Sequence, residues 1–300
     1  MQIIDLQKKY QSIPTLNLEL LLAAALHQTK EFIYTHPEYP ISIIQYLRFR
    51  WFIHLYKQGY SIAVITKHKE FYGLDFFVNK NVLIPRPDTE LMVAEAIEDI
   101  KYQVLSSKET LLIDIGTGSG CIPIAILKTL TNKNINTFAT DISRSALRVA
   151  KKNAKKHGVK INFLHGNLLE PVLSVIPATS GNPDNSTGYW IPNLIGNDNR
   201  VIITANLPYL TEQQFQQSPS IQKEPKIALT AENNGLALYE KLLKQITSLI
   251  SNIKYPISVF LEIDPSQTET IQKLIKQYLP NAITETKKDL NGLNRLVKIF

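Results

Sequence analysis

Cysteine is almost absent from this chain, whose 300 residues include only Cys121. A single cysteine cannot form an intrachain disulfide, and it excludes a metal site built from several cysteines. Its neighbours Gly120, Ile122 and Ile124 indicate a small, buried apolar position. The scarcity of cysteine is typical of a protein from a reducing compartment.

Long hydrophobic runs are also missing. The one apolar run, residues 16–28 (LNLELLLAAALHQ), is interrupted by Glu19 and is too short to span a bilayer. The N-terminal sequence MQIIDLQKKY lacks the charged and then apolar pattern of a secretory signal. We therefore expect a cytoplasmic protein that does not enter a membrane.

A concentrated basic region is absent too, although the net charge is +7. The positive excess is spread along the chain and forms no basic arm. The densest basic stretch, residues 148–160 (RVAKKNAKKHGVK), has helical spacing that favours a solvated helix face over an RNA-contacting patch. Nucleic acid is therefore not an expected partner. The apolar side of this helix would contain Leu147, Val149, Ala150 and Ala154.

The spacing of apolar residues changes near residue 72. Before this point they recur every three or four positions, with proline and glycine at the breaks, which predicts a small bundle of helices. Residues 71–87 then contain two short apolar runs on either side of Asn79, Lys80 and Asn81, which predicts a β-hairpin linker. We assign residues 1–72 to an all-α domain and residues 73–300 to the hairpin and a second domain.

Apolar runs alternate with helical patterns in the second domain. Such alternation implies the α/β class, with a parallel sheet and helices on both of its faces. Residues 177–200 interrupt the pattern, because they are dense in Pro, Gly, Asn, Asp and Ser and show no period, so we expect a long surface loop. The expected strands are residues 110–115, 135–142, 200–207, 255–264 and 296–300.

A glycine-rich loop follows the first of these strands in the sequence LLIDIGTGSGCIPIAI. Gly116, Gly118 and Gly120 would let a ligand lie against bare backbone where a helix begins. The next strand ends at Asp141, where a carboxylate can accept hydrogen bonds from two ribose hydroxyls. A dinucleotide or S-adenosylmethionine would satisfy this half-site equally well. In a purely structural alternative, the glycines form a tight turn and Asp141 caps the following helix.

The segment VIITANLPYL places Asn206, Pro208 and Tyr209 where a buried strand ends. A planar amino or amide NH2 group is a poor nucleophile, because its lone pair is delocalised. The Asn206 side-chain oxygen and the Leu207 carbonyl, fixed by Pro208, would offer two acceptors for its N–H bonds, and the Tyr209 ring would pack against it. Together with the glycine loop, this segment favours a methyltransferase that acts on such a nitrogen.

The chain resembles the S-adenosylmethionine-dependent methyltransferases, and among them the family that methylates glutamine in class-1 peptide-chain release factors. The resemblance extends over nearly the whole chain. Its most specific motif outside the glycine loop and the Asn-x-Pro-Tyr segment is VLIPRPDTE. The matching segments are residues 82–90, 223–229 (KEPKIAL), 234–243 (NGLALYEKLL) and 288–297 (KDLNGLNRLV).

This resemblance implies a Rossmann-like methyltransferase domain and assigns substrate recognition to residues 1–72. It also implies that a monomer methylates the side-chain amide of the glutamine in the Gly-Gly-Gln motif and converts S-adenosylmethionine to S-adenosylhomocysteine. Asn206, Pro208 and Tyr209 would be catalytic, and with Leu207 they would hold the glutamine. The cofactor would contact Gly116, Thr117, Gly118, Ser119, Gly120, Asp141, Asn167, Leu168 and Asn206.

The motif IPRPDTE has a simpler explanation for most of its residues. Asp88, Thr89 and Glu90 suit the start of a helix, as capping residues and as an acidic residue in the first turn. Capping does not explain Arg86, which only the resemblance places near the active site, as a substrate-binding residue. Glu262 also ends a strand, where it would either face the cleft or cap a helix.

Three positions, in two segments, depart from the family pattern. Leu207 stands where the family usually has proline, but the chemistry requires only the carbonyl of this residue. Asn167 and Leu168 stand where an acid and an aromatic residue are common. Asn167 can still hydrogen-bond to adenine, but a stacking contact would be lost, so we expect weaker adenine binding.

Two other functions fit parts of the sequence. The Asn-Leu-Pro-Tyr form also resembles the rRNA adenine dimethyltransferases, but the helical N-terminal residues and the dispersed charge weigh against an enzyme of nucleic acid. A methyltransferase fold without activity, acting only as a binding module, is the second. The complete glycine loop, Asp141 and the Asn206 segment argue against that possibility.

Overall fold

The computed structural model describes five stretches of the chain. The described residues are 1–102, 109–131, 134–175, 200–252 and 255–300. The predicted loop at 177–200 therefore lies outside the described residues, apart from Arg200, which begins a strand.

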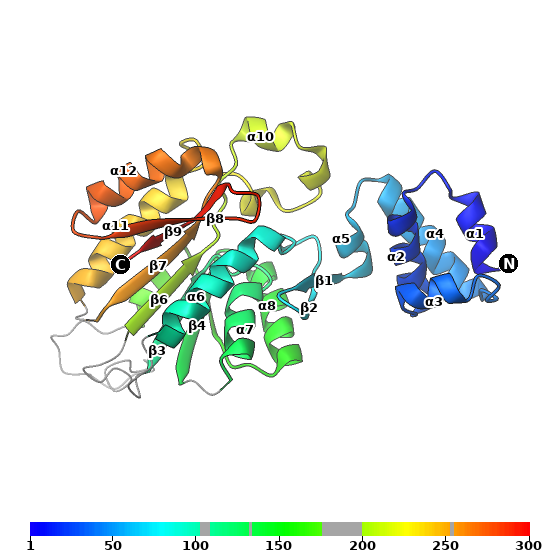
Figure 1. Ribbon diagram of the computed structural model, residues 1–300, viewed down its shortest axis with the longest axis horizontal. Coiled ribbons are helices and arrows are strands. Elements are labelled where there is room, and N and C mark those ends of the chain that lie inside the picture. The colour runs from blue at the N-terminus through cyan, green and yellow to red at the C-terminus, as the bar shows by residue number, and fades with distance from the viewer. Residues whose placement is uncertain (103–108, 132–133, 176–199, 253–254) are drawn as a thin grey trace. The chain divides into compact units, whose positions relative to one another are not determined.

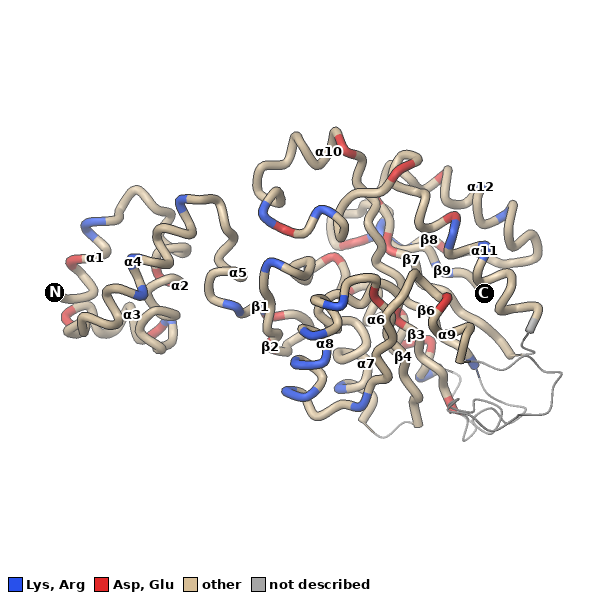
Figure 2. The backbone as a smooth tube through the Cα atoms, turned by 180° about the vertical axis from the view of Figure 1, so that it is seen from behind, with Lys and Arg blue, Asp and Glu red and all other residues tan. Residues whose placement is uncertain are grey.

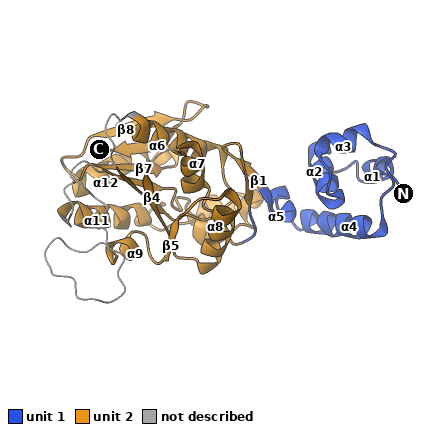
Figure 3. Ribbon diagram, turned by 90° about the horizontal axis from the view of Figure 1, so that it is seen from below, with its two compact units in different colours: residues 1–68, 78–80 blue, residues 69–77, 81–300 orange. Residues whose placement is uncertain are grey.

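The chain divides into two units, which Figure 3 distinguishes by colour. Unit 1 comprises residues 1–68 and 78–80, and unit 2 comprises residues 69–77 and 81–300. Unit 2 thus includes residues 69–72, which the sequence pattern placed in the helical domain.

Helices account for most of unit 1, as the apolar spacing predicted. Leu21, Leu22 and Phe49 are fully buried in its own hydrophobic cluster. The longest helix starts with a capping box, in which Ser42 and Gln45 each accept the other's backbone N–H. The helices are α1 (Ile3–Lys9), α2 (Thr15–Leu26), α3 (Lys30–Thr35), α4 (Ile43–Lys57) and α5 (Ile62–Thr66).

The β-hairpin exists, but its turn was placed wrongly. Strands β1 (His68–Phe71) and β2 (Leu74–Phe77) are joined at Tyr72 and Gly73, and not at Asn79–Asn81. Both turn residues have positive φ, 52° at Tyr72 and 70° at Gly73, as a two-residue turn between antiparallel strands requires. Tyrosine is an unusual residue for such a turn, so the polar Asn79–Asn81 gave the stronger signal.

Seven strands form the sheet of unit 2 in the order β5-β4-β3-β6-β7-β9-β8. β3, β4, β5, β6 and β7 are parallel. In the middle of the sheet, Ile115 is paired with Thr140 on one side and with Ala205 on the other. The strands are β3 (Thr110–Ile115), β4 (Ile135–Asp141), β5 (Asn162–His165), β6 (Arg200–Ala205), β7 (Ile257–Glu262), β8 (Thr284–Lys288) and β9 (Asn294–Ile299).

The last predicted strand is present, but it is antiparallel to its neighbours in a sheet that the sequence pattern predicted to be parallel. β9 runs antiparallel to both β7 and β8. A short turn at residues 289–293 joins β8 to β9, and so short a connection suits only antiparallel neighbours. The sequence of β8, TETKK, escaped notice because it lies at an edge of the sheet, is largely exposed and contains no apolar residue.

Helices cover both faces of the sheet (Figure 1). Ile113 and Ile203 pack in one hydrophobic cluster with apolar residues of α11 and α12. Leu112 and Ile202 are also buried and point to the opposite face, where α6, α7 and α8 lie, because side chains alternate along a strand. These helices are α6 (Glu90–Tyr102), α7 (Cys121–Thr129), α8 (Arg144–His157), α11 (Ala237–Asn252) and α12 (Thr268–Tyr278).

Two predictions about individual helices are confirmed. Cys121 begins α7 and is buried. Lys and Arg follow the outer side of α8 (Figure 2), while Leu147, Val149, Ala150 and Ala154 on its other side are buried. The basic stretch is therefore the solvated face of an amphipathic helix.

Short helices lie in the connections. The segment before α6 is the 3-10 helix η1 (Pro87–Thr89), and the residues after β5 form α9 (Glu170–Leu173). Between β6 and α11 come α10 (Glu212–Gln216), η2 (Pro219–Ile221) and η3 (Lys226–Ala228), and η4 (Pro265–Gln267) precedes α12.

Candidate active site

The sequence motifs converge because their strands are neighbours. β4, β3 and β6 lie side by side and parallel, so their carboxyl ends meet at one edge of the sheet. Gly116 follows β3, Asp141 ends β4 and Asn206 follows β6. The crevice outside the carboxyl ends of such strands is the usual ligand site in open α/β sheets.

A cavity of about 410 Å³ opens at this edge. Several residues proposed from the sequence line it, and others lie outside its lining: Thr117, Ser119, Gly120, Tyr209 and Arg86. The predicted site residues in the lining are Gly116, Gly118, Asp141, Asn167, Leu168, Asn206, Leu207 and Pro208.

The glycines of the loop differ in what surrounds them. Gly116 and Gly118 line the cavity. A Cβ atom on Gly120 would lie 3.1 Å from Ile124 Cδ1 and 3.2 Å from Ala150 Cβ. Gly120 thus allows α7 and α8 to pack closely, and Thr117 and Ser119 are buried beside it.

Asp141 is held by backbone hydrogen bonds at both of its oxygens. Gly118 donates its N–H to Oδ2 at 2.9 Å, and Ser143 donates its N–H to Oδ1 at 2.7 Å. Burial raises the pKa of this carboxyl, and the two backbone hydrogen bonds oppose the effect. Each oxygen keeps a free acceptor position, so the carboxylate can hold the glycine loop and still accept hydroxyl groups.

Asn167 and Leu168 form the side of the cavity near β5. Leu168 has φ of 52° and a buried side chain, and its carbonyl accepts a hydrogen bond from Thr140 Oγ1 at 2.8 Å. The Asn167 carbonyl accepts the N–H of Glu170 at 3.2 Å. Both residues are thereby fixed in the wall where the sequence resemblance expects adenine.

The segment from Asn206 to Tyr209 is anchored by three side chains. Asn206 Nδ2 donates to Thr89 Oγ1 at 3.0 Å. The Leu207 N–H donates to the Tyr239 hydroxyl at 3.3 Å, and Gln267 Nε2 donates to the Tyr209 carbonyl at 3.0 Å. The backbone of the segment is therefore rigidly placed at the cavity.

The side chain of Leu207 packs toward the glycine loop. Leu207 is buried, and its Cδ2 would lie 3.2 Å from a Cβ atom on Gly116. The residue that departs from the family pattern is thus accommodated by the absence of a side chain at Gly116. Tyr209 is partly buried, and this burial raises the pKa of its hydroxyl.

Arg86 has a partner that the sequence did not suggest. Its Nη2 lies 2.5 Å from Glu224 Oε1, and the other oxygen of this buried carboxylate accepts the Ile84 N–H at 3.0 Å. Glu224 therefore ties the IPRP segment to the connection between β6 and α11.

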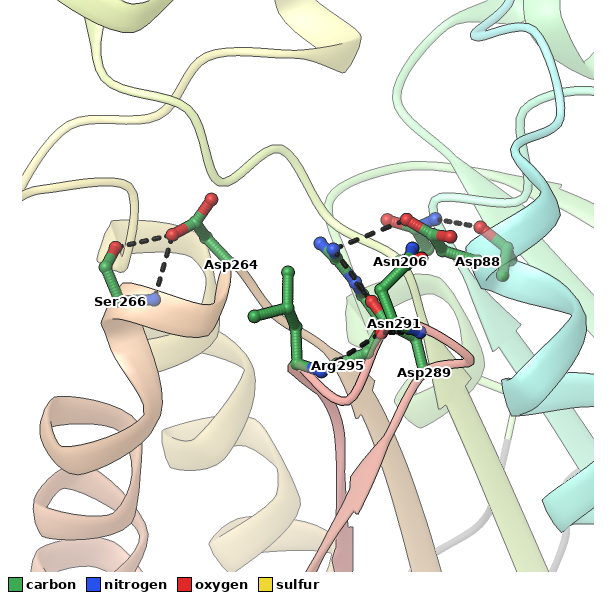
Figure 4. A network of polar contacts seen from close by, with 9 residues as sticks. Asp88, Asn206, Asp264, Ser266, Asp289, Asn291 and Arg295 are labelled. Atoms are coloured by element: carbon green, nitrogen blue, oxygen red, sulfur yellow. Dashed lines mark hydrogen bonds and ion pairs between the residues drawn. The ribbon is translucent and has the colours of Figure 1, made fainter.

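Further charged groups surround the segment from Asn206 to Tyr209. Arg295 Nη2 lies 3.1 Å from Asp289 Oδ2 and 3.4 Å from Asp88 Oδ2 (Figure 4). Glu262, at the end of β7, is buried, and burial raises its pKa to about 7. Hydrogen bonds with Thr89 and Asn206 and the charge of Arg295 oppose this effect.

Sequence reasoning did not select Thr89, Glu224 or Glu262 for the site. A position at the start of a helix fully explains Thr89 in the sequence, so nothing in its motif predicts the contact with Asn206. The strand order does identify Glu262, because it ends β7 next to β6, but this order is known only from the structure. The cavity is further lined from the 227–238 region by Ile227, Ala228, Thr230, Ala231, Glu232, Ala237 and Leu238.

Family models match both parts of the chain. Residues 106–177 match a methyltransferase domain, and residues 4–66 match the PrmC N-terminal domain. With the order of strands and the motifs at their carboxyl ends, these matches define a Rossmann-like methyltransferase.

Similar proteins identify the family within this class of methyltransferases. The chain is 32% identical to the release factor glutamine methyltransferase of Bacillus anthracis, over 93% of this chain and 90% of that protein. It is 31% identical to the protein of the same name from Bacillus subtilis (strain 168), over 93% and 88%. The chain belongs to the release factor glutamine methyltransferase family.

A solved structure shares the fold. The hMettl16 catalytic domain, in complex with MAT2A 3′UTR hairpin 6, is similar with a TM-score of 0.51 and 16% identity over 79% of each chain. At this identity the similarity concerns the fold alone.

Among the described residues, no helix is long and apolar enough to cross a membrane. The same residues contain no group of three or more His, Cys, Asp or Glu side chains suited to hold a metal ion.

Proposed function

We propose that this protein transfers a methyl group from S-adenosylmethionine to the side-chain amide nitrogen of the glutamine in the Gly-Gly-Gln motif of class-1 peptide-chain release factors. The reaction supports translation termination and leaves S-adenosylhomocysteine. The observation that carries the proposal is one cavity lined by Gly116, Gly118 and Asp141 together with Asn206 and Pro208. Family membership supplies the substrate class.

The cavity residues fit S-adenosylmethionine, which supplies a methyl group on a sulfonium when bound. The bare backbone at Gly116 and Gly118 allows close approach, and the free acceptor positions of Asp141 suit the two ribose hydroxyls. Asn167 and Leu168 would contact adenine, and Asn206 would complete the site. Thr117, Ser119 and Gly120 belong to the same loop but lie outside the cavity lining.

The Asn206 segment would hold the glutamine amide. Asn206 Oδ1 and the Leu207 carbonyl accept its two N–H bonds, Pro208 keeps the backbone rigid, and the Tyr209 ring packs on the planar group. Orientation matters here because the amide nitrogen is a poor nucleophile. Arg86 belongs to the proposed substrate site through its ion pair with Glu224, which fixes the segment before α6.

In the proposed function, the enzyme is a monomer and its substrate is a protein. Release factors act in translation, so the proposed place of the reaction is the cytoplasm. The rival function, methylation of an adenine amino group, would use the same Asn206 segment, but the family relatives and their matching N-terminal domain favour the glutamine substrate.

The test is single-turnover transfer of a labelled methyl group to a release factor at saturating cofactor, with the modified residue mapped by mass spectrometry. Asn206→Ala is expected to lower the rate on the order of 10²-fold, because one oriented hydrogen-bond acceptor is lost. Asn206→Asp also lowers it, since aspartate adds a negative charge and loses the hydrogen that Nδ2 donates to Thr89.

The matched control is Asn291→Ala, which removes an exposed asparagine outside the cavity lining and should keep the wild-type rate. A rate near wild type in Asn206→Ala would exclude this segment as the catalytic feature. Label on an RNA adenine, and none on the release factor, would instead establish the rival function.

A further inference from the structure

The amide of Asn206 has two orientations of nearly the same shape. In one, Oδ1 faces the substrate and accepts an N–H bond. In the other, Nδ2 faces the substrate, and its two N–H bonds oppose the N–H bonds of the substrate amide. The proposed clamp works only in the first orientation, so something must distinguish the two.

Thr89 and Glu262 lie next to this amide. Asn206 Nδ2 donates to Thr89 Oγ1 at 3.0 Å, and Glu262 lies close enough to both residues that hydrogen bonding to them lowers the pKa of its carboxyl. Both partners are buried, each with 2% of its surface exposed.

The chemistry of these groups selects one orientation. A carboxylate only accepts hydrogen bonds, so ionised Glu262 requires donors from both Thr89 and Asn206. The Thr89 hydrogen is then directed to Glu262, and its oxygen is left as an acceptor for Asn206 Nδ2. A flipped Asn206 would place Oδ1 against a carboxylate and a hydroxyl oxygen, which is repulsive.

We propose that Thr89 and Glu262 are positioning residues that hold the Asn206 amide with Oδ1 toward the substrate. This inference rests on the proposed function, since it concerns the orientation of the acceptor used there. It adds that the acceptor is set by a buried carboxylate on the neighbouring strand β7.

The protonation state of Glu262 then controls the orientation. Protonated Glu262 becomes a donor and can hydrogen-bond to Oδ1 of a flipped Asn206. Burial raises the pKa of Glu262 to about 7, so the carboxylate form prevails above neutral pH and is lost as the pH falls through about 7. Among the described residues, Glu262 Oε2 has no hydrogen-bond partner.

Other titratable groups around Glu262 do not produce the same effect. Arg295 and Asp88 form an ion pair, with Nη2 and Oδ2 3.4 Å apart. Burial raises the pKa of the remaining groups, which keeps them neutral near pH 7. The groups that act on Glu262 are Arg295 from β9, Asp88 from η1, Tyr209 after β6, Tyr239 from α11 and Cys121 from α7.

The experiment measures single-turnover methylation of a release factor at saturating cofactor between about pH 6 and about pH 8.5. The wild-type rate is expected to fall as the pH drops through about 7. Glu262→Gln should be roughly 3- to 10-fold slower at the alkaline end, because either orientation of Asn206 then finds a partner, and its rate should lose this pH dependence. Cofactor affinity, measured by calorimetry, should be unchanged.

Thr89 provides a pair of variants that separates orientation from packing. Thr89→Val keeps the shape but removes the acceptor, and it should slow turnover roughly 3- to 10-fold. Thr89→Ser restores the hydroxyl and should recover most of the rate. If Glu262→Gln does not fold, this pair decides the matter alone.

A second buried carboxylate serves as the control. Burial also raises the pKa of Asp114 to about 7, and Thr204 Oγ1 donates to it at 2.7 Å, but Asp114 does not line the cavity. Asp114→Asn should retain the pH dependence of turnover. Loss of that dependence in Asp114→Asn, with persistence in Glu262→Gln, would overturn the assignment to Glu262.

The outcomes also separate this inference from the proposed function. Wild-type rates in both Thr89→Val and Glu262→Gln, with a large loss in Asn206→Ala, would refute the orienting role and leave the clamp intact. A wild-type rate in Asn206→Ala would refute the clamp itself.

Discussion

Asp141 shows how one side chain can shape a loop and remain available to a ligand. Its two oxygens accept the N–H groups of Gly118 and Ser143, but α8 is capped by Ser143, whose hydroxyl oxygen accepts the Ala146 N–H, and not by Asp141. Accepting these two N–H groups does not compete with ligand binding, because a carboxylate oxygen accepts more than one hydrogen bond. Holding the glycine loop and binding a ribose are therefore compatible at this position.

We predict that Asp141→Ala weakens the binding of S-adenosylmethionine. The variant loses charge-assisted hydrogen bonds worth roughly 1.5–3 kcal/mol, which corresponds to a Kd raised about 10- to 150-fold. Calorimetric titration measures this change. The fold should remain intact, since the carboxylate lies at a loop and not within the hydrophobic core.

Asp264→Ala is the matched control for this prediction. Asp264 also accepts a backbone N–H, from Ser266 at 3.0 Å, but it does not line the cavity. Its loss should leave the affinity for the cofactor unchanged. An unaltered Kd in Asp141→Ala would remove Asp141 from the proposed cofactor site.

At the scale of elements, α8 connects the hairpin to the glycine loop through one buried residue. Asn153 Oδ1 accepts the Phe77 N–H at 2.8 Å, and Nδ2 donates to the Phe77 carbonyl and to the Ser119 carbonyl, both at 2.9 Å. The sequence presents this residue as one of several polar positions on a basic helix. The structure makes it the link between β2, α8 and the cofactor loop.

Asn153→Ala is expected to destabilise the protein by about 2–4 kcal/mol. The substitution leaves the partly buried N–H and carbonyl of Phe77 and the buried carbonyl of Ser119 without this partner, and each buried group left unpaired costs about 1–3 kcal/mol. Chemical denaturation monitored by circular dichroism measures the loss. The exposed Lys155→Ala, on the same helix, should change stability by less than about 0.5 kcal/mol. Equal stabilities of the two variants would contradict the role of Asn153.

At the scale of the whole molecule, the chain combines two units with separate hydrophobic cores. Residues that line the cavity all belong to unit 2. The assignment of substrate recognition to residues 1–72 stays a prediction, and the position of the hairpin determines how it should be tested. A cut near Phe71, where the apolar pattern changes, would remove most of β1.

A shortened chain that starts at Lys67 keeps the whole hairpin and is expected to bind S-adenosylmethionine like the full chain. It should methylate an intact release factor poorly, because it lacks the helical unit. Calorimetry and the methylation assay measure these two properties separately. Full activity on the intact factor would show that residues 1–66 do not contribute to recognition.

Short sequence patterns predicted those elements of the fold that depend mainly on neighbouring residues in the chain. The helices of unit 1 follow from apolar residues at three- and four-residue spacing, and the glycine loop from its place between a buried strand and a helix. Such patterns failed to predict elements whose residues are unusual for their type of structure. The hairpin turn uses Tyr72, and the edge strand β8 has no apolar residue, so neither resembles its usual sequence.

The sequence by itself determined the chemistry available to this protein: a glycine loop, an acidic residue after the next strand and an Asn-x-Pro-Tyr segment. Only the tertiary structure decided which groups act on them. Thr89 is separated from Asn206 by more than a hundred positions in the chain, and Glu262 becomes its neighbour only through the order of β6 and β7. Burial then raises the pKa of Glu262, and burial is a property of packing that no local pattern of residues contains.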